Sequence, residues 1–187
     1  MTTIVAVKKG KRICLASDSL SVFGHEKETP GRQVDSNPKW IHAGKNTIGI
    51  SGHHSWKLLL SAYFSKKKIP VWETPEEVFE AVVKLHHHLK EHCFFTPPNL
   101  RYLPVESSEF QLLVVNPHGI FEVEHSRTVR QHLYFTAIGT GEEYALGAIS
   151  AIYEHIGDPE EIARIGIETA AEFDSKTCLP LHTKVFI

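Results

Sequence analysis

Thr2 carries two groups that can do chemistry together once Met1 is removed. A small second residue such as threonine permits removal of the initiator methionine, and we expect this to leave a free α-amine on Thr2. The hydroxyl is then a nucleophile, and the amine is a base that takes its proton directly or through water. A free α-amine has a pKa of about 7.7–8.0, so part of it is neutral near pH 7. Many chains begin Met-Thr without using it, so the surroundings must decide.

The histidines are a second candidate group. His86, His87 and His88, with His92 one turn further on, could place two imidazoles on one face of a helix as metal ligands. No acidic residue joins them in an HExxH pattern, and a polar helix face explains them equally well. The three cysteines are far apart and contain no CxxC pair, which argues against a zinc or disulfide framework. We therefore predict no metal and no cofactor.

The elements that must position Thr2 begin directly after it. Residues 2–8 and 12–18 are apolar runs separated by a turn at Gly10, which predicts a β-hairpin covered on both faces. Residues 20–37 are predicted to be a long loop. Further strands are expected at 39–43, 47–52, 110–116, 120–125, 133–139 and 182–187, and helices at 54–65, 74–93, 141–157 and 158–175.

The order of these elements predicts the layers. Strands come first, then two helices, then strands, then two helices and a last strand. Two antiparallel sheets between helix pairs would bury all of the apolar faces. No shift in composition divides residues 1–187, so we expect one α+β domain.

Several ordered motifs resemble the proteasome β-type subunits, and especially the bacterial HslV peptidases. The motifs are "TTIVAV" and "ICLASDS", then "NPKWIH", "IGISGHH", "FTAIGTGEEYALGAISAIYE" and "AAEFDSKT". The resemblance covers essentially the whole chain and places it among proteasome-like N-terminal-nucleophile hydrolases, near HslV or the separate proteasome homologues of some proteobacteria. It implies a four-layer αββα sandwich in which the mature chain begins with the catalytic threonine, Thr2.

The resemblance implies an acid and a lysine beside the nucleophile. Asp18 stands at the end of the second strand, where the family has its aspartate, and Lys39 stands at the start of the third strand. A lysine charge there favours the Thr2 alkoxide and lowers the pKa of the amine, while the aspartate keeps the charge paired. Because the intervening loop is longer than in HslV, Arg32 and Lys45 are alternative candidates.

The resemblance also implies an oxyanion site and a group that orients the amine. The Gly52 N–H corresponds to the donor that stabilises the tetrahedral oxyanion. Thr140 replaces the serine of a Gly-Ser-Gly segment in HslV, and with Asp174 it would orient the amine. Asp174 and Thr177 have the Asp-x-x-Ser/Thr spacing of proteasome β subunits. We therefore expect these residues to gather around Thr2.

Bulk composition gives no sign of a nucleic-acid or membrane partner. The formal net charge is −2 and the pI is about 6.7, and no apolar window is long enough to span a bilayer. The start of the chain lacks the pattern of a secretory signal, so we expect a cytoplasmic protein.

We predict a threonine-type endopeptidase subunit assembled into stacked homo-oligomeric rings. The resemblance implies peptides or unfolded proteins as substrates and an ATP-dependent unfoldase as a partner. Two alternatives stay open. One is a non-catalytic or activator-dependent ring or scaffold subunit, and the other is an amidase that uses the same nucleophile on a small amide.

Overall fold

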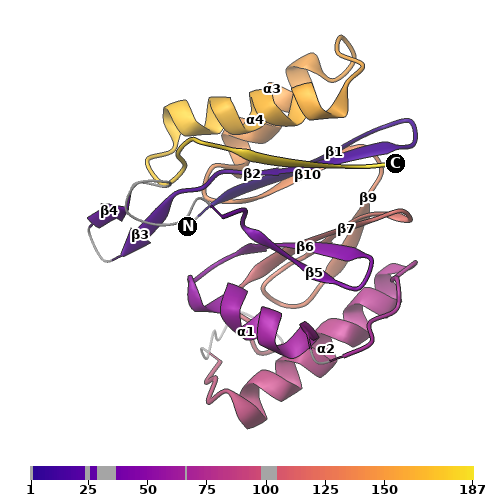
Figure 1. The fold of residues 1–187 in the computed structure, drawn as a ribbon, viewed down its shortest axis with the longest axis vertical. Helices are drawn as coiled ribbons and strands as arrows, with labels where there is room; N and C mark the ends of the chain where they lie inside the picture. Colours follow the sequence, from indigo (N-terminus) through magenta and orange to yellow (C-terminus); the bar gives the residue numbers. More distant parts are fainter. Residues whose placement is uncertain (1, 24–25, 29–36, 66, 98–104) are drawn as a thin grey trace.

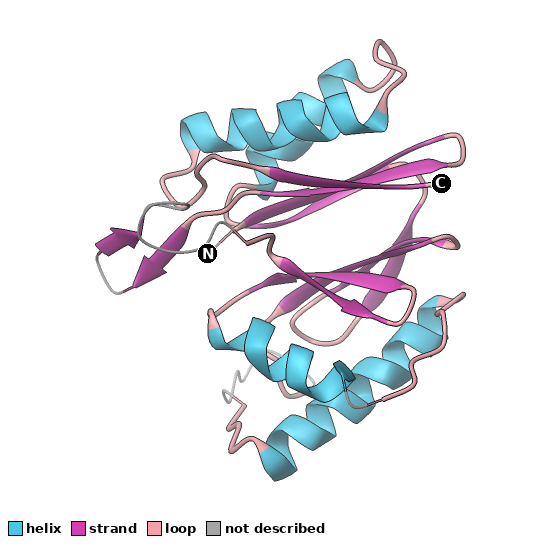
Figure 2. Cartoon of the chain, in the orientation of Figure 1, coloured by secondary structure: helices cyan, strands magenta, loops and turns pink. Residues whose placement is uncertain are grey.

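Two antiparallel sheets lie face to face between two pairs of helices in the computed structural model, which describes residues 2–23, 26–28, 37–65, 67–97 and 105–187 (Figure 1). One helix pair packs on the outer face of each sheet (Figure 2). The helices are α1 (Ser55–Ser65), α2 (Pro75–His92), α3 (Glu142–Ile152) and α4 (Pro159–Phe173). The predicted four-layer αββα sandwich is confirmed.

The sheet whose first strand directly follows Thr2 is covered on both faces. Its strand order is β10–β1–β2–β11, and its strands are β1 (Thr3–Lys9), β2 (Arg12–Ser17), β10 (Phe135–Gly139) and β11 (His182–Phe186). Along β1, Val5 and Val7 pack against α3 and α4, whereas Ile4 and Ala6 face the other sheet. Both faces being covered explains why the apolar run does not alternate with polar residues.

The second sheet packs on α1 and α2. Its strands, in spatial order, are β5 (Trp40–Ala43), β6 (Asn46–Ser51), β7 (Gln111–Asn116), β8 (Gly119–Val123) and β9 (Val129–His132). Large buried side chains fill the layer below it, among them Leu60, Leu85, Phe110 and Phe121. The sheet therefore carries the end of β6, and with it Gly52, on a rigid support.

The two longer helices begin as the sequence predicts. The Thr74 hydroxyl accepts a hydrogen bond from the Glu77 N–H at 3.3 Å, and the Asp158 carboxylate accepts one from the Glu160 N–H at 3.2 Å. A proline follows each capping residue in the first turn, where its missing N–H costs nothing. These caps fix the starts of α2 and α4.

The prediction of one long loop over residues 20–37 is wrong in part. Strands β3 (Ser21–Phe23) and β4 (Glu26–Glu28) form a small two-stranded sheet within it. Each has three residues, and the second reads Glu-Lys-Glu, so neither carries an apolar period. Strand β9 was also missed, because its sequence "VRQH" is polar and lies at a sheet edge.

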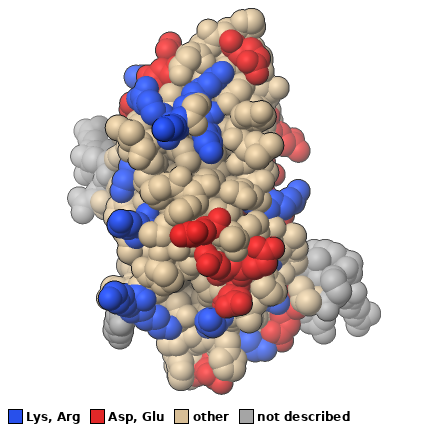
Figure 3. All heavy atoms as spheres, turned by 90° about the vertical axis from the view of Figure 1, so that its right-hand side faces the viewer, with Lys and Arg blue, Asp and Glu red and all other residues tan. Residues whose placement is uncertain are grey.

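Charged side chains of both signs share the surface. On the face shown in Figure 3, basic and acidic side chains are interspersed among uncharged residues. In the described part of the chain, no helix combines the length and the hydrophobicity needed to cross a bilayer.

Candidate active site

Thr2 is buried at the start of β1, beside the ends of β2 and β10. Its carbonyl oxygen accepts a hydrogen bond from the Thr140 N–H at 2.9 Å. Gly139 permits this approach, because a Cβ at that position would collide with the Thr2 oxygen. Gly139 also has φ +101°, a conformation that other residues rarely adopt. The end of β10 therefore holds the main chain of Thr2 in place.

The carboxylate of Asp18 accepts a hydrogen bond from the Thr2 hydroxyl. It follows the last residue of β2 and is completely buried. Its Oδ1 accepts hydrogen bonds from the Thr2 Oγ1 at 2.8 Å and from the Thr3 N–H at 2.9 Å. Its Oδ2 accepts from the N–H groups of Leu20 at 3.0 Å and Cys178 at 3.3 Å. Four donors thus surround the carboxylate before its counter-ion is considered.

Lys39 is that counter-ion. Its Nζ lies 2.8 Å from Oδ1 and 3.0 Å from Oδ2 of Asp18, with 15% of its side chain exposed. Burial lowers the pKa of the Lys39 ammonium, and the Asp18 charge opposes that change. The alternative Lys45 lies in the exposed turn between β5 and β6, and Arg32 lies outside the described residues. The structure thus brings together Thr2, Asp18 and Lys39.

The segment that carries Lys39 is held by two other elements. The Lys39 carbonyl accepts a hydrogen bond from the Ile50 N–H of β6 at 2.9 Å. The Lys57 ammonium of α1 donates to the Pro38 carbonyl at 2.7 Å. Lys39 is therefore fixed relative to the end of β6, two residues before Gly52.

Gly52 occupies a place where a larger residue would not fit. Its φ is +149°, and an added Cβ would lie 2.9 Å from Trp56 Cδ1 and 3.1 Å from the Glu109 carbonyl oxygen. The last residue of β6, Ser51, also reaches the Thr2 region, because its Oγ lies 3.2 Å from an ideal Cβ on Gly139. The turn that contains Gly52 therefore adjoins the start of β1, while the role of its N–H stays a prediction.

The second carboxylate of the site belongs to Asp174, at the end of α4. Its Oδ2 accepts hydrogen bonds from the hydroxyls of Thr140 and Thr177, each at 2.7 Å. Its Oδ1 accepts from the Lys176 N–H at 3.1 Å. Partial burial acts to raise the pKa of Asp174, but these hydrogen bonds outweigh it and hold the pKa below its ordinary value.

Thr3 connects the two carboxylates, although the sequence did not single it out. Its N–H binds Asp18, and its Oγ1 lies 2.5 Å from the Thr177 Oγ1. Thr177 in turn binds Asp174. A second threonine in a strand is ordinary in sequence terms, so only the structure reveals this link.

Two protease subunits are similar in sequence to this chain, although no family model matches it. The ATP-dependent protease subunit HslV of Caldicellulosiruptor saccharolyticus is 28% identical over 172 residues, which cover 91% of this chain and 89% of that protein. The corresponding subunit of Hyphomonas neptunium is 24% identical over 172 residues, covering 91% and 84%.

Among solved structures, Thiobacillus denitrificans BPH has a TM-score of 0.90 and 35% sequence identity, covering 98% of this chain and 97% of that chain. The same protein is also solved in complex with epoxomicin, with the same values. The chain belongs to the HslV-like family of threonine peptidases. HslV from Trypanosoma brucei, at 23% identity and a TM-score of 0.69, shares the fold. The HslV-like chain is thus a threonine endopeptidase, of the kind that forms a subunit of a compartmentalised protease.

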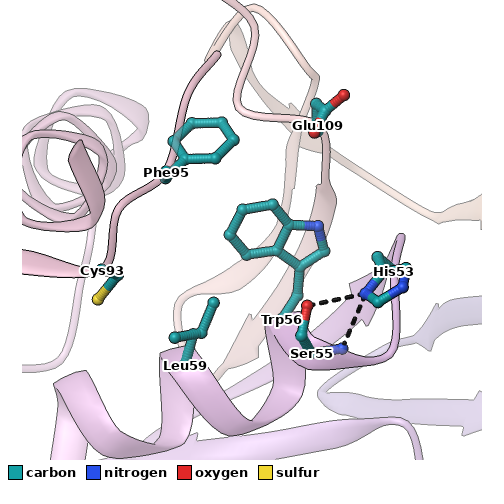
Figure 4. A pocket seen from close by; sticks show the side chains of 7 residues that line it. All are labelled: His53, Ser55, Trp56, Leu59, Cys93, Phe95 and Glu109. Atoms are coloured by element: carbon teal, nitrogen blue, oxygen red, sulfur yellow. Dashed lines mark hydrogen bonds between the residues drawn. The ribbon is translucent and has the colours of Figure 1, made fainter. Parts of the chain in front are cut away.

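A pocket of about 480 Å³ opens beside Gly52 in the HslV-like chain. Figure 4 shows its apolar walls, formed by Trp56, Leu59 and Phe95, with His53 at one edge. The Nδ1 of His53 lies 2.8 Å from the Ser55 Oγ, so the first turn of α1 fixes the imidazole. Trp56 is the residue that also crowds Gly52, and the pocket therefore shares a wall with the predicted oxyanion site.

The histidines of α2, which were candidate metal ligands, contact different neighbours. The Nδ1 of His86 lies 3.0 Å from the Ser108 Oγ, and its Nε2 lies 3.2 Å from Glu106. The rings of His88 and His92 contact each other with centroids 4.6 Å apart. Among the described residues, no group of three or more His, Cys, Asp or Glu side chains is arranged to hold a metal ion.

Proposed function

We propose that Thr2 of the HslV-like chain is an N-terminal nucleophile that hydrolyses peptide bonds after removal of Met1. One observation carries the proposal: the Thr2 Oγ1 and the Lys39 Nζ lie at the same distance, 2.8 Å, from a single oxygen of the buried Asp18. This places a cation next to the hydroxyl. The positive charge favours the alkoxide form of the nucleophile.

The reaction balances with the groups of Thr2 alone. The hydroxyl oxygen attacks the peptide carbonyl while its proton passes to the α-amine, directly or through water. The C–N bond then breaks, the resulting ammonium returns the proton to the leaving amine, and an ester to Thr2 remains. Water, deprotonated by the same amine, then attacks the ester. The bond between the acyl carbon and the Thr2 oxygen breaks, the ammonium returns its proton to that oxygen, and the carboxylic acid is released. Lys39 stays charged throughout and lowers the pKa of the amine.

The remaining residues position the reacting groups. The Gly52 N–H is proposed to stabilise the oxyanion, and removal of one such donor typically costs about 10²–10³-fold in rate. Thr140 and Asp174 are proposed to orient the α-amine, with Thr177 supporting the carboxylate. The Thr140 N–H bond to the Thr2 carbonyl supports this arrangement, because it keeps Thr140 beside the residue that carries the amine.

The assembly is part of the proposal. We infer a cytoplasmic homo-oligomer of stacked rings that receives unfolded chains or peptides from an ATP-dependent unfoldase. The HslV relatives are subunits of an ATP-dependent protease, which supports such a partner. Large apolar side chains exposed on α1 and α2 offer surfaces for contacts between subunits: Leu58, Phe79 and Val83.

The intact mass of the purified protein, measured with and without epoxomicin, tests the proposal. An epoxyketone needs both the amine and the hydroxyl to form its cyclic adduct, so we expect loss of Met1 and one adduct per chain. Thr2→Ala is the matched control, because it still permits methionine removal but lacks the hydroxyl. Retention of Met1, or removal of Met1 with no adduct, would contradict an open N-terminal nucleophile and favour the scaffold alternative.

A further inference from the structure

We propose that the hydroxyl of Thr3 is a positioning group for the Thr2 nucleophile, acting through Thr177 and Asp174. The inference rests on the proposed function, because it assumes that Thr2 reacts and that the Asp174 cluster orients its amine. It adds a residue that touches neither substrate nor the reacting atoms but determines where they lie.

The directions of the hydrogen bonds follow from the number of available protons. A hydroxyl has one hydrogen to donate, and an ionised carboxylate only accepts. Thr177 donates its hydrogen to the Asp174 Oδ2 at 2.7 Å. In the 2.5 Å contact between the two threonine hydroxyls, Thr3 is therefore the donor. A directed chain of hydrogen bonds runs from Thr3 to Thr177 to Asp174.

The surroundings leave these hydroxyls little freedom. Thr3 is completely buried and Thr177 is 3% exposed, so water does not compete for either group. A Cβ on Gly141 would collide with the Thr3 Oγ1 and would lie 3.0 Å from the Thr177 Oγ1. A buried hydroxyl that loses its partner costs free energy. The contact between the two threonines is therefore a defined part of the structure.

The main chain of Thr3 is fixed to the other carboxylate. Its N–H donates to Asp18, and its carbonyl oxygen accepts from the Asp18 N–H at 3.2 Å. The residue thus binds Asp18 through its backbone and Thr177 through its side chain, and Thr177 in turn donates to Asp174. Because Thr2 is its covalent neighbour, any rotation of Thr3 moves the nucleophile, and a misplacement of about 1 Å can cost about 10²-fold in rate.

The test compares Thr3→Val, which keeps the shape but not the donor, with Thr3→Ser, which keeps the donor. Peptide hydrolysis is measured per active site, counted by epoxomicin adducts in the intact mass. We expect Thr3→Val to lower kcat about 10-fold with KM changed less than about 2-fold, and Thr3→Ser to recover most of the rate. A lost structural hydrogen bond alone would lower the number of folded sites and not kcat per site.

Thr136→Val is the matched control. It removes another buried threonine hydroxyl, which donates to Glu122 at 2.9 Å away from the site, and we expect kcat per site to be unchanged. A wild-type kcat in Thr3→Val, or an equal fall in the Thr136→Val control, overturns the inference. If Thr3→Val does not fold, Thr3→Ala applies the same test with less steric demand beside Gly141. Wild-type protein that forms no adduct defeats the proposed function instead.

Discussion

Two carboxylates, those of Asp18 and Asp174, lie near the start of β1, and their surroundings differ. Asp18 is completely buried, has Lys39 as its counter-ion and accepts hydrogen bonds from several backbone N–H groups. Asp174 is only partly buried, and two threonine hydroxyls and the Lys176 N–H are its donors. One carboxylate thus has a cation in addition to its neutral donors, whereas hydrogen bonds from neutral groups hold the other.

This difference separates two tasks. A buried carboxylate requires a cation and fixed donors, because solvent cannot stabilise its charge. The Asp18 side therefore combines stability with the placement of charge beside the Thr2 hydroxyl. A partly exposed carboxylate tolerates the loss of one donor, because water can replace it. We expect the Asp174 side to adjust the reaction without deciding whether the protein folds.

The largest effect should come from removing the cation of the buried pair. Lys39→Met leaves Asp18 buried and unpaired, which should reduce the free energy of unfolding by about 3–5 kcal/mol. The rate of epoxomicin adduct formation should fall on the order of 10²–10³-fold. Urea unfolding and timed intact-mass measurements test both. Lys45→Met makes the same chemical change in an exposed turn and should alter stability by less than about 0.5 kcal/mol. Equal stability of the two variants would contradict the comparison.

An intermediate effect is expected at the second carboxylate. Asp174→Asn should lower kcat about 10-fold, because an amide orients the amine less well than a carboxylate does. The free energy of unfolding should change by only about 1 kcal/mol, since water reaches this group. Peptide hydrolysis and urea unfolding measure the two quantities, with Glu172→Gln on the exposed end of α4 as the control. A loss of stability as large as that of Lys39→Met would remove the distinction between the two sides.

The smallest effect concerns pH. Partial burial acts to raise the pKa of Asp174, but hydrogen bonds from Thr177 and Thr140 lower the pKa by more than burial raises it. The net effect is a lowered pKa, so folding favours the ionised form. The resulting stability is present above the unfolded-state pKa, near 3.8, and is lost as the pH falls through the lower folded-state pKa. Thr140→Val should therefore be less stable than wild type at pH 7, with the difference shrinking in acid. Urea unfolding at several pH values tests this, and a difference independent of pH would count against it.

Much of the sheet that contains β1 and β2 was predictable from sequence, for physical reasons. The apolar runs on either side of Gly10 fit a hairpin covered on both faces, and the observed β1–β2 pairing confirms it. The capping residues Thr74 and Asp158 likewise determined where α2 and α4 begin. The small sheet of β3 and β4 could not be predicted, because its three-residue strands carry no hydrophobic period.

The candidate site was predictable only where a side chain is distinctive. The structure brings Asp18 and Lys39 together with Thr2, and Thr140 and Thr177 together with Asp174, although their roles stay predictions. Other donors to Asp18 come from backbone N–H groups, which any residue except proline supplies. Thr3 looks like an ordinary strand residue. Such contacts depend on the fold and leave no mark in the sequence.

Asp18 also makes the effects of neighbouring substitutions interdependent. Its Oδ1 is shared by the Thr2 hydroxyl, the Thr3 N–H and the Lys39 ammonium, so a change in one donor alters the field and geometry experienced by the others. The free energies of single substitutions around this carboxylate will therefore not sum to those of the combined variants. A double-mutant cycle that joins Lys39→Met to Thr2→Ala will report the coupling through Asp18, because both side chains bind its Oδ1.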